Sequence, residues 1–148
     1  MFKKIDVIFQ VEHVDRELES YKAVAKNIKE KYGMTSLIIS NMFHSYYLFF
    51  YKPKIIIWNN LQQNISGLNG FMWETYGENI KYISHRWEQL LFPYKFKLCA
   101  PQNQFEKNKV IFFAWDDEFK KYLINHGVKE NNVKVVGSVA NNILRKLN

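Results

Sequence analysis

The sequence predicts a Rossmann-like α/β domain of three layers, built around a mostly parallel sheet of about six strands. Two observations lead to this fold class. Strand-like runs alternate with amphipathic helical segments along the chain, an order typical of parallel sheets with right-handed crossovers. The runs are also nearly continuous in Val, Ile and Phe, as in Lys4–Val11, which is typical of strands buried on both faces.

Further strands follow from similar apolar, β-branched runs. They are expected at Thr35–Ser40, Lys54–Trp58, Asn79–Ser84, Val110–Trp115 and Val133–Val136. Other helices are expected at Met42–Tyr51, where Pro53 stops the helix, and at Gly67–Tyr76 and Ala140–Leu147. The region from His85 to Lys109 is predicted to be a long loop with one short element.

For two helices, the sequence indicates both the first and the last residues. The first is expected to begin with Asp15 as its N-cap and to end at Gly33. Its inward face is predicted to carry Leu18, Tyr21, Ala25, Ile28 and Tyr32. The second follows Asp116, also expected as an N-cap, turns Phe119 inward and closes at Gly127.

Length and composition limit the classes of protein to which this chain can belong. A chain of 148 residues fits one domain, and 47% apolar residues exclude a disordered chain. The single Cys99 cannot form an internal disulfide, which suits a reducing cytoplasm. No stretch reaches the roughly 18 apolar residues of a membrane span. We therefore expect a cytoplasmic protein, with a peripheral position at the inner face of the cell membrane as a further expectation.

The net charge of +7 favours anionic partners. Because the basic residues are dispersed, most are expected on solvated helix faces, and no nucleic-acid partner is expected. Aromatic residues and lysines interleave at Phe43–Lys54 and Arg86–Lys97. This pattern fits a patch that contacts an anionic membrane, and equally an ordinary core beside snorkelling lysines.

Ligands of open α/β sheets bind beyond the carboxyl ends of the strands, so the residues after each strand are the candidates. The first strand leads into Glu12, His13, Arg16 and Glu17. Arg16 could clamp a phosphate or carboxylate, and Glu12 could act as a base. The alternative is a purely structural helix start, with Arg16 solvated and Glu17 favouring the helix dipole.

The fourth strand leads into His85, Arg86, Trp87 and Glu88. An indole can stack on a sugar face while an adjacent carboxylate deprotonates a hydroxyl group. The alternative is a tryptophan buried for packing beside an exposed glutamate. After the sixth strand, Ser138 either meets a ligand or belongs to a simple turn.

Motifs for other chemistries are missing from the sequence. There is no GxGxxG, P-loop or HExxH motif and no cysteine pair, so dinucleotide, P-loop and metal sites lack their main support. We expect no cofactor and no metal. Asp116, Asp117 and Glu118 are interpreted as a helix cap and first turn rather than as catalytic acids.

Three segments together resemble one family. They are Glu12 with Arg16-Glu17-Leu18 and a helix ending at Gly33, the pair Trp87-Glu88, and Phe112–Val128 followed by Val133–Ser138. The chain resembles the amino-terminal domain of bacterial GT-B glycosyltransferases that build surface polysaccharides, such as capsule and lipopolysaccharide sugar transferases. Where relatives often carry a second acidic residue, this chain has Gln89.

The resemblance implies a transferase with two domains. This domain would bind the acceptor, a sugar or lipid-linked saccharide, while a carboxyl-terminal domain would bind the nucleotide-sugar donor. Glu88 or Glu12 would be the catalytic base, and Arg16 would steady an anionic group. The resemblance also implies that this domain alone is inactive. Two alternatives stay open: half of a GT-B-related sugar epimerase, or a non-catalytic module that binds carbohydrate or membrane.

Overall fold

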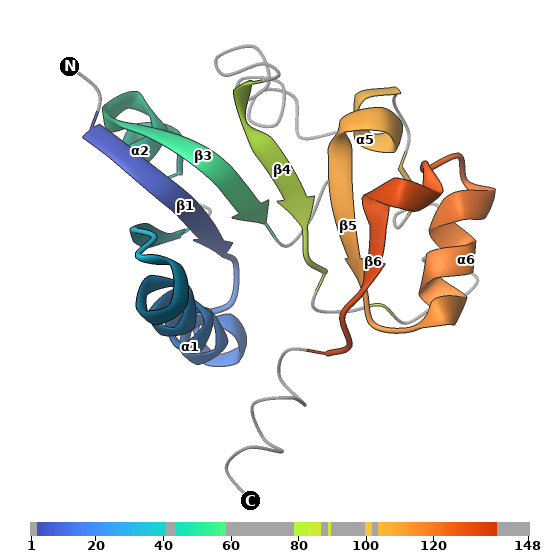
Figure 1. The fold of residues 1–148 in the computed structure, drawn as a ribbon, viewed down its shortest axis with the longest axis horizontal. Coiled ribbons are helices and arrows are strands. Elements are labelled where there is room, and N and C mark those ends of the chain that lie inside the picture. The colour runs from blue at the N-terminus through green and yellow to red at the C-terminus, as the bar shows by residue number, and fades with distance from the viewer. Residues whose placement is uncertain are drawn as a thin grey trace, which may run out of the picture.

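The computed structural model describes residues 3–40, 44–58, 79–86, 89, 100–101 and 104–138. Six strands form one sheet in the order β2-β1-β3-β4-β5-β6, and every neighbouring pair is parallel. The strands are β1 (Lys3–Val11), β2 (Ser36–Ser40), β3 (Tyr51–Trp58), β4 (Lys81–Ser84), β5 (Val110–Ala114) and β6 (Val133–Val135). Figure 1 shows the labelled strand arrows pointing the same way. This sheet confirms the predicted α/β fold class.

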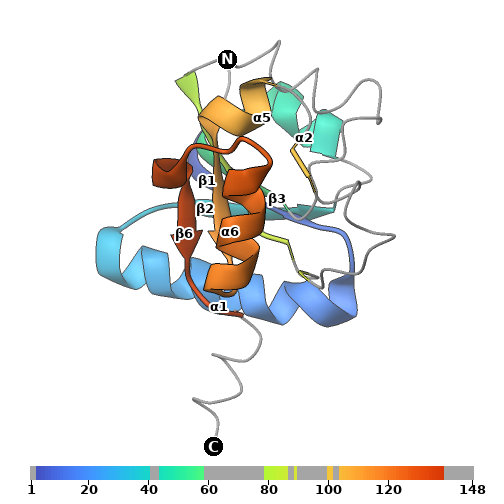
Figure 2. The same ribbon diagram turned by 90° about the vertical axis from the view of Figure 1, so that its right-hand side faces the viewer.

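Helices lie on both sides of the sheet. The described helical elements are α1 (Val14–Tyr32), α2 (His44–Phe50), α5 (Gln104–Lys109), α6 (Asp117–Asn125) and the short 3-10 helix η2 (Glu130–Asn132). In Figure 1, α1 lies beside β1 while α6 lies beside β5 and β6. Figure 2, turned by 90°, shows α1 crossing below the sheet and α5 and α6 on the side nearer the viewer.

Alternation along the strands produces two apolar cores. Val7, Phe9 and Val11 of β1 pack with Tyr21 of α1 in one cluster. Ile8 points to the opposite face, into the larger cluster that includes residues of β3, β4, β5 and α6. Because both faces of β1 are covered, its sequence is nearly continuous in apolar residues rather than alternating.

The start of α1 differs from the prediction. The N-cap is His13, which makes no side-chain cap hydrogen bond, and Asp15 lies within the first turn. Tyr32 was expected to point inward, but it is 71% exposed. It is the last helical residue, beyond Val24, Ala25 and Ile28, which pack against the core. The predicted end is correct, since Gly33 has a left-handed φ of 65°.

The start of β3 also differs from the prediction, because the strand begins at Tyr51 rather than Lys54 and includes Pro53. Pro53 has no N–H to donate, yet it lies in the strand opposite Ile5 of β1. Pairing between β3 and β4 starts only at Ile55, so Pro53 lies where β3 is paired on one side alone. A strand tolerates proline at such an edge position.

The start of α6 agrees with the prediction. The Asp116 side chain accepts a hydrogen bond of 2.8 Å from the backbone N–H of Phe119. Gly127 follows the helix with a φ of 92°. Between His85 and Lys109, where a long loop with one short element was expected, the described residues include the short helix α5, and most of the region lies outside them. The helices predicted at Gly67–Tyr76 and Ala140–Leu147, and Cys99, lie outside the described residues.

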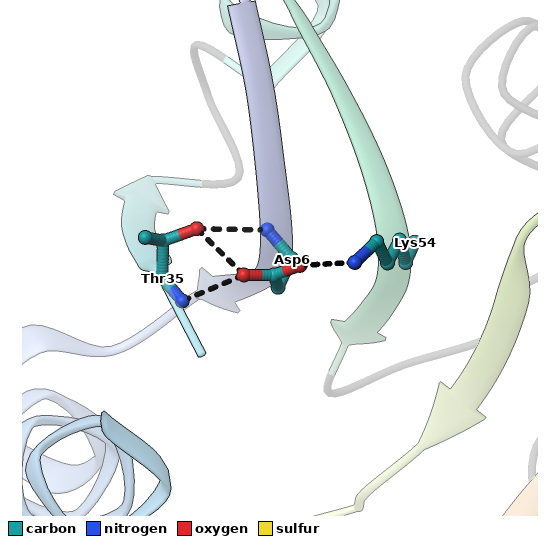
Figure 3. A network of polar contacts seen from close by, with 3 residues as sticks. All are labelled: Asp6, Thr35 and Lys54. Atoms are coloured by element: carbon teal, nitrogen blue, oxygen red, sulfur yellow. Dashed lines mark hydrogen bonds and ion pairs between the residues drawn. The ribbon is translucent and has the colours of Figure 1, made fainter. Parts of the chain in front are cut away.

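A polar network ties β1 and β3 to the residue that precedes β2, near the amino ends of the strands (Figure 3). The Asp6 carboxylate accepts hydrogen bonds of 2.8 Å from both the backbone N–H and the hydroxyl of Thr35. Its other oxygen lies 2.7 Å from Nζ of Lys54. The Lys54 ammonium, together with the Thr35 donors, lowers the pKa of Asp6 to about 2.

Candidate functional site

The strand order defines a topological switch point between β1 and β3. The chain leaves β1 toward β2 on one side and later leaves β3 toward β4 on the other. Connections that diverge in this way open a crevice beyond the carboxyl ends of the two strands, where α/β proteins bind their ligands. The turn from β1 into α1, which holds Glu12 and His13, lies at this point.

A buried carboxylate organises the turn from β1 into α1. Glu17 is fully buried, and its Oε2 accepts a hydrogen bond of 2.8 Å from the backbone N–H of Glu12. Its Oε1 lies 3.2 Å from Nη2 of Arg16, whose side chain is 37% exposed. Glu12 and His13 are exposed. Glu17 therefore holds the turn in place, while Glu12, His13 and Arg16 present their side chains at the surface.

His85 lies at the carboxyl end of β4 and is 2% exposed. Its backbone N–H donates to the carbonyl oxygen of Trp58 at the end of β3, 2.9 Å away. Its ring makes edge contacts with Tyr21 of α1 and Phe113 of β5. Burial lowers the pKa of His85 to about 4, so the imidazole is neutral at neutral pH.

Tyr21 packs against β1 and against the residue that follows β4. Its ring packs against Phe9 of β1, with centroids 5.0 Å apart, and against His85, with centroids 6.1 Å apart. β1 and the residue that follows β4 thus pack against the same buried side chain of α1. Only β3 separates β1 from β4, which places their carboxyl ends about 10 Å apart at the usual strand spacing.

Gln89 fixes the segment that follows His85 and Arg86. The side chain is buried, and its Nε2 donates to the carbonyl oxygen of Phe113 at 2.8 Å. Its Oε1 accepts from the backbone N–H of Trp115 at 2.6 Å. This amide group satisfies backbone groups at the end of β5 much as a neighbouring strand would. No sequence pattern marks Gln89 as a structural residue, because one glutamine in a loop carries no periodic signal.

Buried hydrogen-bonding atoms gather at the same edge of the sheet. Within the described part of the chain, no partner is found for Nε1 of Trp58, Oγ of Ser84 or Nε1 of Trp115. These residues end or follow β3, β4 and β5. Buried polar groups without partners are uncommon in folded proteins and call for an explanation, such as a ligand or a water molecule.

The structure brings together some predicted site residues and separates another. Glu12, His13, Arg16, His85 and Arg86 belong to the carboxyl ends of β1 and β4. Ser138 follows β6, four strand positions from β1 and thus about 19 Å away along the sheet. It is therefore far from the turn after β1, although β6 lies only two strand positions from β4. Trp87 and Glu88 lie outside the described residues, so their roles remain predictions.

Metal ligands are not grouped in the described residues, where no set of three or more His, Cys, Asp or Glu side chains could hold an ion. None of the described helices combines the length and the apolar character that crossing a bilayer requires. A scan against protein-family models and searches of curated proteins and of solved structures each found no match for this chain. The resemblance to GT-B glycosyltransferases therefore stays a prediction from the sequence motifs.

Proposed function

We propose that this chain is the acceptor-binding domain of a glycosyltransferase that builds a surface polysaccharide. The acceptor would be an acidic or lipid-linked saccharide, and the nucleotide-sugar donor would be bound mainly by a second domain. The observation that supports this most is the position of Glu12, His13 and Arg16 at the topological switch point. The sequence motifs that resemble GT-B enzymes add the reaction class.

Arg16 is the proposed anchor for the acceptor. Its guanidinium group has a planar set of donors that matches a carboxylate or phosphate. One nitrogen faces the buried Glu17, which orients the side chain, and the partly exposed remainder can meet an anion. Glu17 thereby limits the conformations of Arg16 before the acceptor binds, which reduces the entropy lost on binding.

Two carboxylates are proposed as the catalytic base. Glu12 lies exposed at the switch point, and Glu88 follows the carboxyl end of β4 in the sequence. Either carboxylate would take the proton from the acceptor hydroxyl as that oxygen attacks the anomeric carbon of the donor. The bond from that carbon to the phosphate oxygen breaks at the same time, and the nucleoside diphosphate leaves. In a protein that includes the donor-binding domain, Glu88→Gln should lower turnover by roughly 10²–10⁴-fold if Glu88 is the base.

Saccharide binding tests the proposal on this chain directly. We expect saturable binding of an oligosaccharide containing glucuronic acid, measured by titration calorimetry, and weaker binding of its neutral glucose analogue. Arg16→Ala should weaken binding of the acidic saccharide by at least about tenfold, since a charge-assisted hydrogen bond contributes about 1.5–3 kcal/mol. The matched control is Lys121→Ala on α6, an exposed cation away from the site. Equal binding by both variants would contradict the proposed anchor.

A non-catalytic binding module is the second candidate, and the exposed aromatic side chains of α2 favour it. Turnover of two variants distinguishes this module from a transferase. If Glu12→Gln and Glu88→Gln each leave turnover unchanged while acidic saccharides still bind, the carboxylates have no catalytic role. For the sugar epimerase alternative, a product assay would find an epimerised sugar and no sugar transferred to an acceptor.

A further inference from the structure

Three large aromatic side chains of α2 are exposed at the amino-terminal edge of the sheet. Tyr46 and Phe49 are each 63% exposed and Phe50 is 50% exposed. The Tyr46 and Phe50 rings pack on each other, with centroids 5.1 Å apart, so they form one surface rather than isolated side chains. Tyr47, in contrast, turns toward the large core cluster. The helix therefore has an inner side anchored in the protein and an outer aromatic side in solvent.

Lysines lie in the strand ends next to this aromatic surface. Phe50 leads directly into β3, where Tyr51 pairs with Lys3 and Lys52 pairs with Lys4 of β1. Nζ of Lys3 lies 6.0 Å from the centroid of the Tyr51 ring. Lys3, Lys4 and Lys52 are exposed. We call Tyr46, Phe49, Phe50, Lys3, Lys4 and Lys52 the α2 surface.

Negative charge is almost absent from the same region. Residues 1–5 and 41–58 contain no Asp or Glu. The carboxylate nearest in the strands, Asp6, is paired with Lys54 at 2.7 Å and is hydrogen-bonded to Thr35. Lys3, Lys4 and Lys52 therefore add positive charge to two segments that contain no carboxylate of their own.

We propose that the α2 surface binds the face of an anionic lipid bilayer. Exposed aromatic rings insert at the boundary between headgroups and acyl chains, where their flat apolar faces leave water. Lysines of the adjoining strand ends are attracted to anionic headgroups, by about 1 kcal/mol each near the surface. An acidic protein partner would satisfy the lysines but has no need for three neighbouring aromatic rings. This inference does not rest on the proposed transferase function.

Vesicle sedimentation tests the α2 surface. The chain should bind vesicles of phosphatidylcholine with 30% phosphatidylglycerol, a composition we choose to be anionic, and should stay in solution with pure phosphatidylcholine. Phe49→Ser should weaken binding by about tenfold, because partial burial of a phenyl group in the interface contributes roughly 1.5 kcal/mol. Lys4→Gln combined with Lys52→Gln should weaken it by about 25-fold, fivefold for each lysine.

Matched variants elsewhere provide the controls. Tyr32→Ser removes a ring that is 71% exposed at the end of α1, and Lys31→Gln with Lys121→Gln removes two exposed lysines of α1 and α6. The affinity of these variants for anionic vesicles should stay within about twofold of that of the original chain, because attraction to anionic lipid decreases with distance from the membrane. Circular dichroism and thermal melting establish that each variant is folded.

Three outcomes would overturn the proposal. One is no binding to anionic vesicles, and another is equal loss of binding in the control variants. The third is a dimer, seen by analytical ultracentrifugation, that Phe49→Ser dissociates; the α2 surface would then contact a second copy of the chain. Saccharide binding is measured without lipid, so its failure and the failure of vesicle binding are separate results.

Discussion

A fully buried carboxylate, Glu17, determines how the turn after β1 presents its neighbours. Its carboxylate accepts a hydrogen bond from the backbone N–H of Glu12 and another from the guanidinium group of Arg16. The sequence pattern identified the cluster of charges at this turn. It could not show which carboxylate is inside, because Glu12 and Glu17 both follow an apolar strand within a few residues. Burial was decided by the direction of α1, which turns Glu17 and Ser20 toward the sheet.

Glu17→Ala should destabilise the fold by about 2 kcal/mol. The substitution leaves the N–H of Glu12 without its charged acceptor, and hydrogen bonds to charged groups contribute about 1.5–3 kcal/mol. Urea denaturation measures the change. Glu19→Ala is the control in the same helix, because the Glu19 side chain is 82% exposed and its ion pair with Lys22 should contribute less than about 1 kcal/mol. Equal effects of the two substitutions would contradict the role assigned to Glu17.

His85 makes stability depend on pH in the mildly acidic range. Its pKa falls from 6.5 to about 4 on folding, so the unfolded chain binds its proton first as the pH is lowered. The contribution is therefore present above pH 6.5 and is lost as the pH falls to about 4. At 1.36 kcal/mol per pKa unit, the contribution of His85 to the free energy of unfolding is about 3 kcal/mol. His85→Phe should flatten the stability curve over this range.

Direct titration of the His85 imidazole by NMR checks the cause of that pH dependence. The ring should stay neutral down to about pH 4, because contacts with Tyr21 and Phe113 exclude water from it. A measured pKa near 6.5 would show that the imidazole is hydrated, and the proposed arrangement of α1 against β4 would then be incorrect.

Single side chains also join elements to one another. The amide of Gln89 connects the segment after β4 to the end of β5 through Phe113 and Trp115. Gln89→Leu keeps a similar volume but removes both the donor to the Phe113 carbonyl oxygen and the acceptor for the Trp115 N–H. We expect a loss of about 2 kcal/mol, set by two unsatisfied backbone groups, and faster hydrogen exchange at the Trp115 amide. Exchange at Trp115 unchanged from the original chain would contradict the link.

The network of Asp6, Thr35 and Lys54 joins β1, β3 and the start of β2 (Figure 3). Because the folded-state pKa of Asp6 is lowered from 3.8 to about 2, its contribution is present above about pH 4 and is lost toward pH 2. Asp6→Asn should therefore be less stable than the original chain at pH 7, and the difference should disappear near pH 2. Denaturant titrations at the two pH values measure this, and a difference that persists at pH 2 would contradict the assignment.

Local signals predicted the elements better than their ends. Apolar runs located the strands, and Asp116 and Gly127 located the ends of α6 correctly. Pro53 was interpreted as a helix stop because its missing N–H usually ends regular structure. It lies inside β3 because β4 pairs only from Ile55 onward, and that register depends on a strand far along the chain. The bridging role of Gln89 also depends on a contact 24 residues away and has no local signal.

At the scale of the whole molecule, the alternation of strands and helices was enough to predict a parallel sheet. It did not predict the strand order, which decides that β1 and β3 flank the switch point. The candidate residues could be named because each follows a strand, and the carboxyl ends of parallel strands share one edge. Their grouping could not be foreseen. The order places β4 two strand positions from β1, and β6, with Ser138, four positions from β1.

The α2 surface and the candidate site lie at opposite edges of the sheet (Figure 1). β1 runs from the α2 surface to the candidate site, and its nine residues span about 30 Å. If both proposals hold, a chain bound to the bilayer through α2 keeps its saccharide site away from the lipid surface. The acceptor would then be the outer end of an extended lipid-linked saccharide rather than a single sugar next to the headgroup.

The most direct measurement of the central claim is an NMR titration of the chain with the glucuronic acid oligosaccharide. Binding at the switch point predicts chemical-shift changes at the backbone amides of residues 12–17 and 84–86, with little change in α2 and in η2. Changes confined to other elements, or none at millimolar saccharide, would contradict a binding site at the carboxyl ends of β1, β3 and β4.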